Sequence, residues 1–227
     1  MKNSNTSVQK LSSEWSQIQL AGSIKGVATD KFAQDSNAIL YPQKLEGNFE
    51  GWTDYFIQYY TPEIDECLKL EAYHFQCAAQ DNNLHPLIRI AAQNFFDTIQ
   101  TITSGNRADL SKILLQSAEY QDDEQDWHTD SYPGMRRVGM RVSGPETEVA
   151  HVDDVTAIRT HDNKSAVIDN PRTTTYGLGS VWANKPGAKT ITQSLFSRFD
   201  DSIDPVTHRK GAPNGKAGLI FTTNLEL

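Results

Sequence analysis

Apolar side chains in the first half of the chain recur at the three- and four-residue steps that place them on one side of a helix. Residues 62–80 repeat in this way after Thr61 and Pro62, an N-cap residue followed by proline at the first helical position, and they predict an amphipathic helix. The apolar set is Ile64, Cys67, Leu68, Ala72 and Phe75. A second helix is predicted from near Pro86 to Gly105 and a third from Ala108 to Glu119, whereas residues 1–60 fit no single pattern.

The pattern changes near residue 120 from helical spacing to alternation. In residues 136–143, Val138, Met140 and Val142 fall on one side of an extended chain, and Arg137 and Arg141 fall on the other. Further short segments of this kind follow, separated by turns rich in Gly, Pro and Asn. We therefore expect an α+β protein in which residues 1–119 are mostly helical, residues 120–227 form a β-sandwich or barrel, and the two parts pack as one compact unit.

Composition narrows the class of protein. The 227 residues are 37% hydrophobic and carry a formal net charge of −8, which suits one sizeable core and argues against a nucleic-acid-binding surface. The first residues lack a signal-peptide core, and no stretch approaches the roughly 18 apolar residues of a membrane span. We expect a cytoplasmic protein with no membrane or nucleic-acid partner.

Its two cysteines, Cys67 and Cys77, are expected to be core thiols rather than a disulfide or a zinc site.

The residues with the strongest chemical signal are His128 and Asp130, in the sequence DWHTD. On a strand, residues two apart point the same way, so both side chains can reach one ion. Non-haem Fe(II) oxygenases hold iron with two histidines and one carboxylate, and His208, just before the last predicted strand, is the candidate for the third ligand. A second pair with the same spacing, His151 and Asp153, is the rival. The plain alternative for His128 is a surface histidine beside the acidic run QDDEQD.

From about residue 120 onwards the chain resembles the Fe(II)/2-oxoglutarate-dependent oxygenase superfamily. The resemblance lies in WHTDSYPGMRRVGMRVSGPETE and VTHRKGAP, which contain an H-x-D, a G-P-x-T-E segment and a late H-R, and which look most like an uncharacterised bacterial family of that architecture. It implies a double-stranded β-helix of the jelly-roll or cupin type, with Fe(II) held by His128, Asp130 and His208 and with 2-oxoglutarate as cosubstrate. It also favours His128 over His151, and it implies a hydroxylase-type dioxygenase that acts on an unknown small molecule or protein side chain.

The chain departs from that family at the residue expected to bind the far carboxylate of 2-oxoglutarate. The family's basic residue lies about ten positions after the distal histidine, where this chain has Gly218. Lys216 has the same strand parity and is the nearest replacement, while Arg137 and Arg141 share a face on an earlier strand. Arg209 is a further candidate, although on a regular strand it would point away from the metal. The plain alternative for the arginines is a charged outer face of a sheet.

Two aromatic residues, Tyr132 and Trp182, are candidates for the wall of a substrate pocket, with ordinary core packing as the alternative. The chain has neither a G-x-S-x-G nucleophile elbow nor a G-x-G-x-x-G dinucleotide loop. The sequence therefore favours an Fe(II)/2-oxoglutarate oxygenase. The alternative from another class is a non-catalytic β-helix module that binds a metal or a ligand, with the helical part as a protein-interaction surface.

Overall fold

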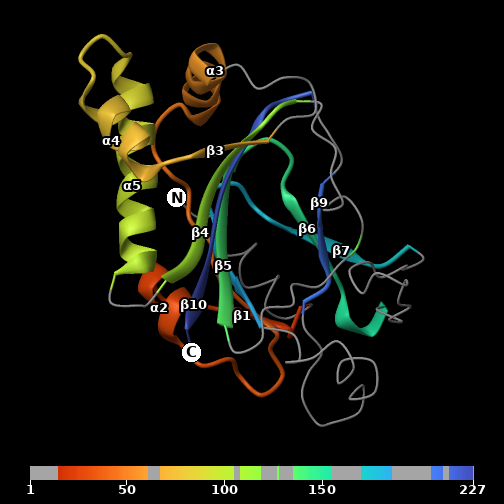
Figure 1. The fold of residues 1–227 in the computed structure, drawn as a ribbon. Helices are drawn as coiled ribbons and strands as arrows, with labels where there is room; N and C mark the ends of the chain where they lie inside the picture. Colours follow the sequence, from red (N-terminus) through yellow and green to blue (C-terminus); the bar gives the residue numbers. More distant parts are fainter. Residues whose placement is uncertain are drawn as a thin grey trace, which may run out of the picture.

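The computed structural model describes residues 15–60, 67–104, 108–118, 127, 135–154, 170–185, 206–211 and 215–226. In these residues the chain forms two β-sheets and a group of α-helices, so the architecture is α+β, as expected (Figure 1). No helix in this part of the chain combines the length and the apolar character that crossing a membrane requires.

The large sheet has seven strands among the described residues, in the order β1-β2-β8-β5-β10-β4-β3. They are β1 (Ile18–Leu20), β2 (Ala38–Tyr41), β8 (Val181–Asn184), β5 (Met135–Ser143), β10 (Gly218–Glu226), β4 (Ala108–Gln116) and β3 (Cys67–Leu70). β1 and β2 are parallel, and the other neighbouring pairs are antiparallel. Since β10 pairs with β4 on one edge and with β5 on the other, residues from both halves of the sequence build the centre of one sheet.

The small sheet has the order β7-β6-β9, and its neighbouring strands are antiparallel. These strands are β6 (Thr147–Ala150), β7 (Thr173–Tyr176) and β9 (His208–Lys210), and a short 3-10 helix, η2 (Val152–Asp154), follows β6. After β5 the chain crosses to the small sheet for β6 and β7, returns for β8, crosses again for β9 and returns for β10. The two sheets are thus interleaved along the sequence, which is typical of jelly-roll folds.

Helices cover one face of the large sheet, on the left in Figure 1, whereas the small sheet lies on the right. They are α2 (Ile24–Thr29), α3 (Phe49–Tyr60), α4 (Ala72–Gln80) and α5 (Pro86–Thr103). The apolar sides of α3, α4 and α5 meet around Trp52, whose ring contacts those of Phe49, Phe56, Phe75 and Phe95 at centroid distances of 5.1 to 5.7 Å. Full burial of a large apolar side chain contributes about 1.5–3 kcal/mol, so this cluster is a main attraction among these three helices.

The opposite face of the large sheet meets the small sheet through a second core. This core consists of Trp15, Ile18, Ala38, Leu40, Val149, Tyr176, Trp182 and Val206. The rings of Tyr176 and Trp182 stack with 5.6 Å between their centroids, and the Tyr176 hydroxyl donates to Asn184 Oδ1 at 3.0 Å. These contacts hold β7 against β8 across the space between the sheets.

The structure confirms one helix prediction and corrects two. α5 is the helix expected from Pro86. The helix expected over residues 62–80 exists only from Ala72, since Cys67–Leu70 forms the edge strand β3 and residues 61–66 lie outside the described part. The helix expected over residues 108–119 is instead the strand β4.

The prediction of a helix over residues 108–119 was wrong for a physical reason. Ile113 and Leu115, two positions apart, both join the core beneath the helices, as the alternation of a strand requires. Short apolar runs fit either period, and pairing with β3 and β10 selects the strand. The region before residue 120 therefore contributes β1 to β4 to the large sheet as well as the helices.

Two further expectations have clear outcomes. The alternation predicted for residues 136–143 is confirmed, because Val138, Met140 and Val142 all join the core beneath the helices. Cys77 is exposed on α4 rather than buried, which corrects the expectation of a core thiol.

Candidate functional site

A set of side chains on the large sheet faces the small sheet rather than the helices. We call it the inner polar face; it consists of Arg137 and Arg141 on β5, Trp182 and Asn184 on β8, and Thr222 and Asn224 on β10. Alternate residues of the same strands, such as Val138, Val181 and Phe221, lie beneath the helices. The strand register gathers the set, since Arg137 lies opposite both Asn184 and Asn224.

Several polar atoms of the inner polar face are buried and make no hydrogen bond. They are Trp182 Nε1, Asn184 Nδ2, Thr222 Oγ1, and both Oδ1 and Nδ2 of Asn224. Asn224 is 0% exposed and Thr222 is 4% exposed. A buried polar group without a partner costs about 1–3 kcal/mol, and native proteins usually satisfy such groups with water, an ion or a ligand. These groups could therefore hydrogen-bond to water, an ion or a polar ligand between the sheets.

Buried cations surround the same space. Arg141 is 2% exposed, and its Nη1 donates to Gln116 Oε1 at 3.0 Å. A Cβ atom added to Gly218 would lie 2.9 Å from Arg141 Nη1, so the glycine makes room for the guanidinium. Lys210 of β9 is 5% exposed, and it lies opposite Thr147, on the inner side of the small sheet. Where the structure describes the side chains, none of the Asp and Glu residues is buried.

A second buried arginine, Arg136, belongs to the other face of β5. It donates to the carbonyl oxygens of Val27, at 2.9 Å, and Asp30, at 2.5 Å, at the end of α2. Burial lowers the pKa of this guanidinium, while Asp30 opposes that shift. Arg136 therefore stabilises a helix end rather than the interior between the sheets.

His208 is the predicted metal ligand that the structure describes. It opens β9, is 6% exposed, and lies opposite Val149, whose side chain is in the core between the sheets. Its ring centroid is 6.3 Å from that of Trp182. Nδ1 lies 3.4 Å from the carbonyl oxygen of Val206; since a carbonyl can only accept, this contact favours the tautomer with hydrogen on Nδ1.

Trp127, the residue directly before His128, packs against β9. The Arg209 guanidinium lies over the Trp127 ring at 4.4 Å from its centroid, and Trp127 is 7% exposed. Arg209 also pairs with Glu148 Oε2 through Nε at 2.8 Å and through Nη2 at 2.7 Å. Arg209 and Glu148 lie opposite each other on the outer side of the small sheet, the side away from His208.

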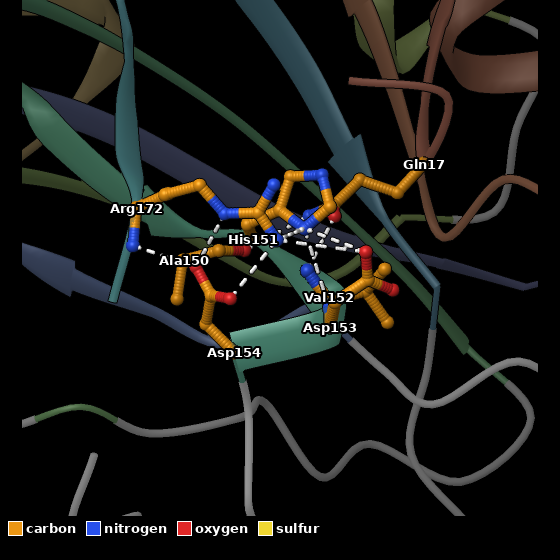
Figure 2. Close-up of polar contacts among 7 residues, drawn as sticks. All are labelled: Gln17, Ala150, His151, Val152, Asp153, Asp154 and Arg172. Atoms are coloured by element: carbon orange, nitrogen blue, oxygen red, sulfur yellow. Dashed lines mark hydrogen bonds and ion pairs between the residues drawn. The ribbon is translucent and has the colours of Figure 1, made fainter. Parts of the chain in front are cut away.

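The rival pair, His151 and Asp153, lies in a network dominated by Arg172 (Figure 2). The Arg172 guanidinium lies 3.1 Å from His151 Nδ1 and 3.5 Å from Asp153 Oδ2. It also forms an ion pair with Asp154, and its hydrogen bonds hold the pKa of that carboxyl at about 2, below the usual range. A guanidinium against both candidate ligands would repel a metal cation, so this pair is a poor metal site.

A glutamine completes the network around His151. Gln17 donates through Nε2 to the Ala150 carbonyl at 2.9 Å and accepts at Oε1 from the Val152 amide at 2.6 Å. The ring of Trp15 meets that of His151 edge to face at 5.0 Å. These contacts tie the segment before β1 to the end of β6, and they give the network a structural role.

Of the other predicted site residues, some lie in the described part of the chain and some do not. His128, Asp130 and Tyr132 lie outside the described residues. Trp182 faces the inter-sheet space, where it packs in the core between the sheets, and Arg137 is half-buried on the same face. No cluster of three or more His, Cys, Asp or Glu side chains suited to a metal occurs within the described ranges.

Lys216 does not have the orientation expected from strand parity. β10 begins only at Gly218, so Lys216 precedes the strand and its side chain is 57% exposed. Its Nζ lies 2.5 Å from Glu50 Oε1 on α3. The parity argument fails because it assumed that the strand extended two residues further.

Sequence reasoning missed four residues that face the inter-sheet space: Lys210, Asn184, Thr222 and Asn224. Lys210 follows His208 by two positions, so the same parity argument applies to it. In β10, Thr222 and Asn224 share one strand parity, but Thr223 between them is also polar, so no alternation in the sequence singles them out. Nothing in the sequence near Asn184 distinguishes it.

No protein-family model and no curated protein sequence matches this chain. Among solved structures, it is similar to a dioxygenase for auxin oxidation from rice, with 10% identity, 92% of this chain and 82% of that chain covered, and a TM-score of 0.40. It is also similar to a full-length Neurospora crassa protein in complex with alpha-KG, with 12% identity, 89% and 77% covered, and a TM-score of 0.38. A third is dioxygenase for auxin oxidation 1 from Arabidopsis thaliana with 2-oxoglutarate, with 11% identity, 98% and 77% covered, and a TM-score of 0.33. Since these TM-scores are low, we base the function on the residues of this chain.

Proposed function

We propose that this chain is an Fe(II)/2-oxoglutarate-dependent oxygenase of the hydroxylase type, with His128, Asp130 and His208 as the metal ligands. One observation carries the proposal, namely the contact between Trp127 and Arg209. It brings the neighbour of His128 against the neighbour of His208, although the two histidines are far apart in the sequence.

The alternation of side chains along a strand relates the contact between Trp127 and Arg209 to the positions of the proposed metal ligands. On β9, Arg209 points outward and His208 points inward. Because Trp127 packs on the outward side, the next residue of an extended chain, His128, would point inward toward His208. Asp130 has the parity of His128. Two imidazoles and one carboxylate on one side of an ion form the donor set that suits non-haem Fe(II).

The order of the strands supports the finer fold proposal, a double-stranded β-helix. In the large sheet β8, β5, β10 and β4 are consecutive neighbours, and the small sheet contains β7, β6 and β9. We propose that the strands of both sheets from β4 onwards form this β-helix. The β-helix would then begin at β4, upstream of residue 120, and would form one compact unit with the helices.

The interior also fits 2-oxoglutarate. This cosubstrate is a dianion, and the inner polar face offers a buried guanidinium together with unpartnered amide and hydroxyl groups. We propose that Arg141 binds the far carboxylate, because it fills the space beside Gly218, and that Arg137 is the second candidate. Arg209 is unsuitable because it is paired with Glu148 on the outer side, and Lys216 because it is paired with Glu50 on the surface.

In this proposal, Fe(II) with 2-oxoglutarate and dioxygen supplies the oxidising chemistry for hydroxylating a small molecule or a protein side chain. The residues of the chain hold and orient the reactants. His208 would offer Nε2 to the metal, Arg141 would fix the far end of the cosubstrate, and Trp182 and Tyr132 would form the wall of a pocket that excludes water.

Metal and cosubstrate titration of the whole protein tests the proposal. Anaerobic Fe(II) and 2-oxoglutarate together should produce a visible absorption that neither produces alone, and the aerobic protein should slowly convert 2-oxoglutarate to succinate. His128→Ala, Asp130→Ala and His208→Ala should each abolish stoichiometric metal binding. Asp153→Ala is the matched control, since Asp153 is 71% exposed, and it should leave binding unchanged.

Two results would contradict the proposal. Loss of metal binding in Asp153→Ala but not in Asp130→Ala would move the site to the rival pair. Failure of the intact protein to bind or consume 2-oxoglutarate would leave the non-catalytic ligand-binding module as the better description.

A further inference from the structure

A pocket lies between α3 and α4. Its cavity measures about 260 Å³. It is lined by Tyr55, Phe56, Tyr59 and Tyr60 of α3, by His74, Cys77 and Ala78 of α4, and by Asp81. In Figure 1, α3 and α4 lie at the upper left, away from β6, β7 and β9. The pocket is therefore separate from the proposed oxygenase site.

The aromatic rings of this pocket are unusually exposed for their size. Tyr59 is 69% exposed, Tyr60 is 39% exposed, and Tyr73, next to His74, is 59% exposed. The rings contact one another, with 4.6 Å between the centroids of Tyr55 and Tyr59 and 5.1 Å between those of Tyr60 and His74. Clusters of exposed aromatic side chains occur at interaction sites more often than expected by chance.

The charge of the pocket is negative. Asp81 accepts a hydrogen bond at Oδ1 from the Asn83 amide at 2.8 Å, and it forms no ion pair with a described Lys or Arg. Burial raises the pKa of Tyr55, with further contributions from Tyr59 and Asp81, so the phenol stays neutral at physiological pH. Neutral aromatic rings attract cations through their faces, and a carboxylate adds a direct attraction.

We propose that this pocket binds the side chain of an arginine presented by a partner polypeptide. A guanidinium is planar and stacks on aromatic rings while it pairs with a carboxylate, which matches the tyrosines and Asp81. Tyr59, which lines the pocket, and Tyr73, whose ring contacts that of His74, are exposed and would contact the partner's backbone around that arginine. The net charge of −8 also favours a basic partner.

The test uses the full chain and a minimal probe, acetyl-Gly-Arg-Gly-amide, titrated while the amide resonances of α3 and α4 are followed by NMR. The matched probe replaces arginine with neutral citrulline, which has nearly the same shape. We expect the arginine peptide to bind at the pocket at least about five-fold more tightly than the citrulline peptide, which corresponds to about 1 kcal/mol of cation recognition.

Variants of the protein separate the attraction of the arginine to the Asp81 carboxylate from its attraction to the tyrosine rings. Asp81→Asn and Tyr59→Leu should each weaken binding of the arginine peptide about five-fold, whereas Tyr59→Phe, which keeps the ring, should not. Asp97→Asn on α5 removes an exposed carboxylate outside the pocket and serves as the control. Because Tyr59 is largely exposed, its variants should fold even if Asp81→Asn does not.

Three outcomes would overturn the proposal. Equal binding of the arginine and citrulline peptides would show that the charge is not recognised. Unchanged binding in Tyr59→Leu would exclude the tyrosine faces. Self-association of the protein that Tyr59→Leu abolishes would show that the surface binds a second copy of the chain instead.

Discussion

Replacing Arg141 with methionine tests the proposed cosubstrate site most directly. Methionine fills much of the space of the arginine stem but removes the guanidinium, which is 2% exposed and points into the inter-sheet space. Removing one partner from a buried ion pair costs about 3–5 kcal/mol. Taking the lower value, the dissociation constant for 2-oxoglutarate should rise roughly 150-fold, because each 1.4 kcal/mol corresponds to a factor of about ten.

The protein without ligand should change much less. Arg141→Met removes the hydrogen bond to Gln116 Oε1 but also removes a buried charge, and these two effects oppose each other. Isothermal titration of 2-oxoglutarate in the presence of Mn²⁺, without oxygen, measures the affinity without turnover. Metal affinity measured alone should be unaffected.

Two companion variants sharpen the test. Lys216→Met removes an exposed cation that is paired with Glu50 on the surface, and it should leave 2-oxoglutarate affinity within about two-fold, since exposed pairs contribute little. In the double variant Arg141→Met/Gly218→Arg, the new arginine would occupy the vacated space and should recover part of the affinity. Unchanged affinity in Arg141→Met, or a loss only in Arg137→Met, would refute the assignment of Arg141.

Further predictions concern stability. Asn224→Leu removes buried polar atoms that make no hydrogen bond, so it should raise the unfolding free energy of the ligand-free protein by about 1–2 kcal/mol in urea while weakening 2-oxoglutarate binding. Gly139→Ala places a Cβ 2.2 Å from Trp182 Cζ2 and should lower that free energy by about 1–3 kcal/mol. Pairing with Arg172 lowers the pKa of Asp154 from 3.8 to about 2. Stability from this pair should therefore be present above pH 4 and decline as pH falls toward 2. Asp154→Asn should remove that decline.

Each of these predictions has a contrary outcome. If Asn224→Leu destabilises the ligand-free protein, Asn224 has a structural role that its geometry does not reveal. If Gly139→Ala is neutral, the Trp182 ring moves aside without cost. If the urea midpoint of Asp154→Asn falls between pH 4 and pH 2 as steeply as that of the unchanged protein, another carboxylate is responsible.

The sequence predicted the pattern of β5 and the helix α5 because each repeats one period over many residues. It failed at β3 and β4, whose short apolar runs fit both periods and become strands only through their partners, β10 above all. For the site, His208 was a candidate because it lies just before the last predicted strand, and alternation added Arg137 and Arg141. Lys216 was misjudged because the start of β10 was taken too early. The close approach of Arg141 to Gly218 joins residues on different strands, and no local pattern contains it.

The central position of β10 has a consequence for how the protein is made. β10 is the most C-terminal of the described strands, yet it pairs with β5 over residues 219–226 and with β4 along its other edge. Until residues 218–226 leave the ribosome, β4 and β5 lack the strand that joins them, and their open edges invite pairing with other chains. While β10 is being synthesised, the unpaired edges of β4 and β5 are therefore sites at which a nascent chain can pair wrongly. Premature stops in this strand should yield aggregates rather than a shortened, working domain.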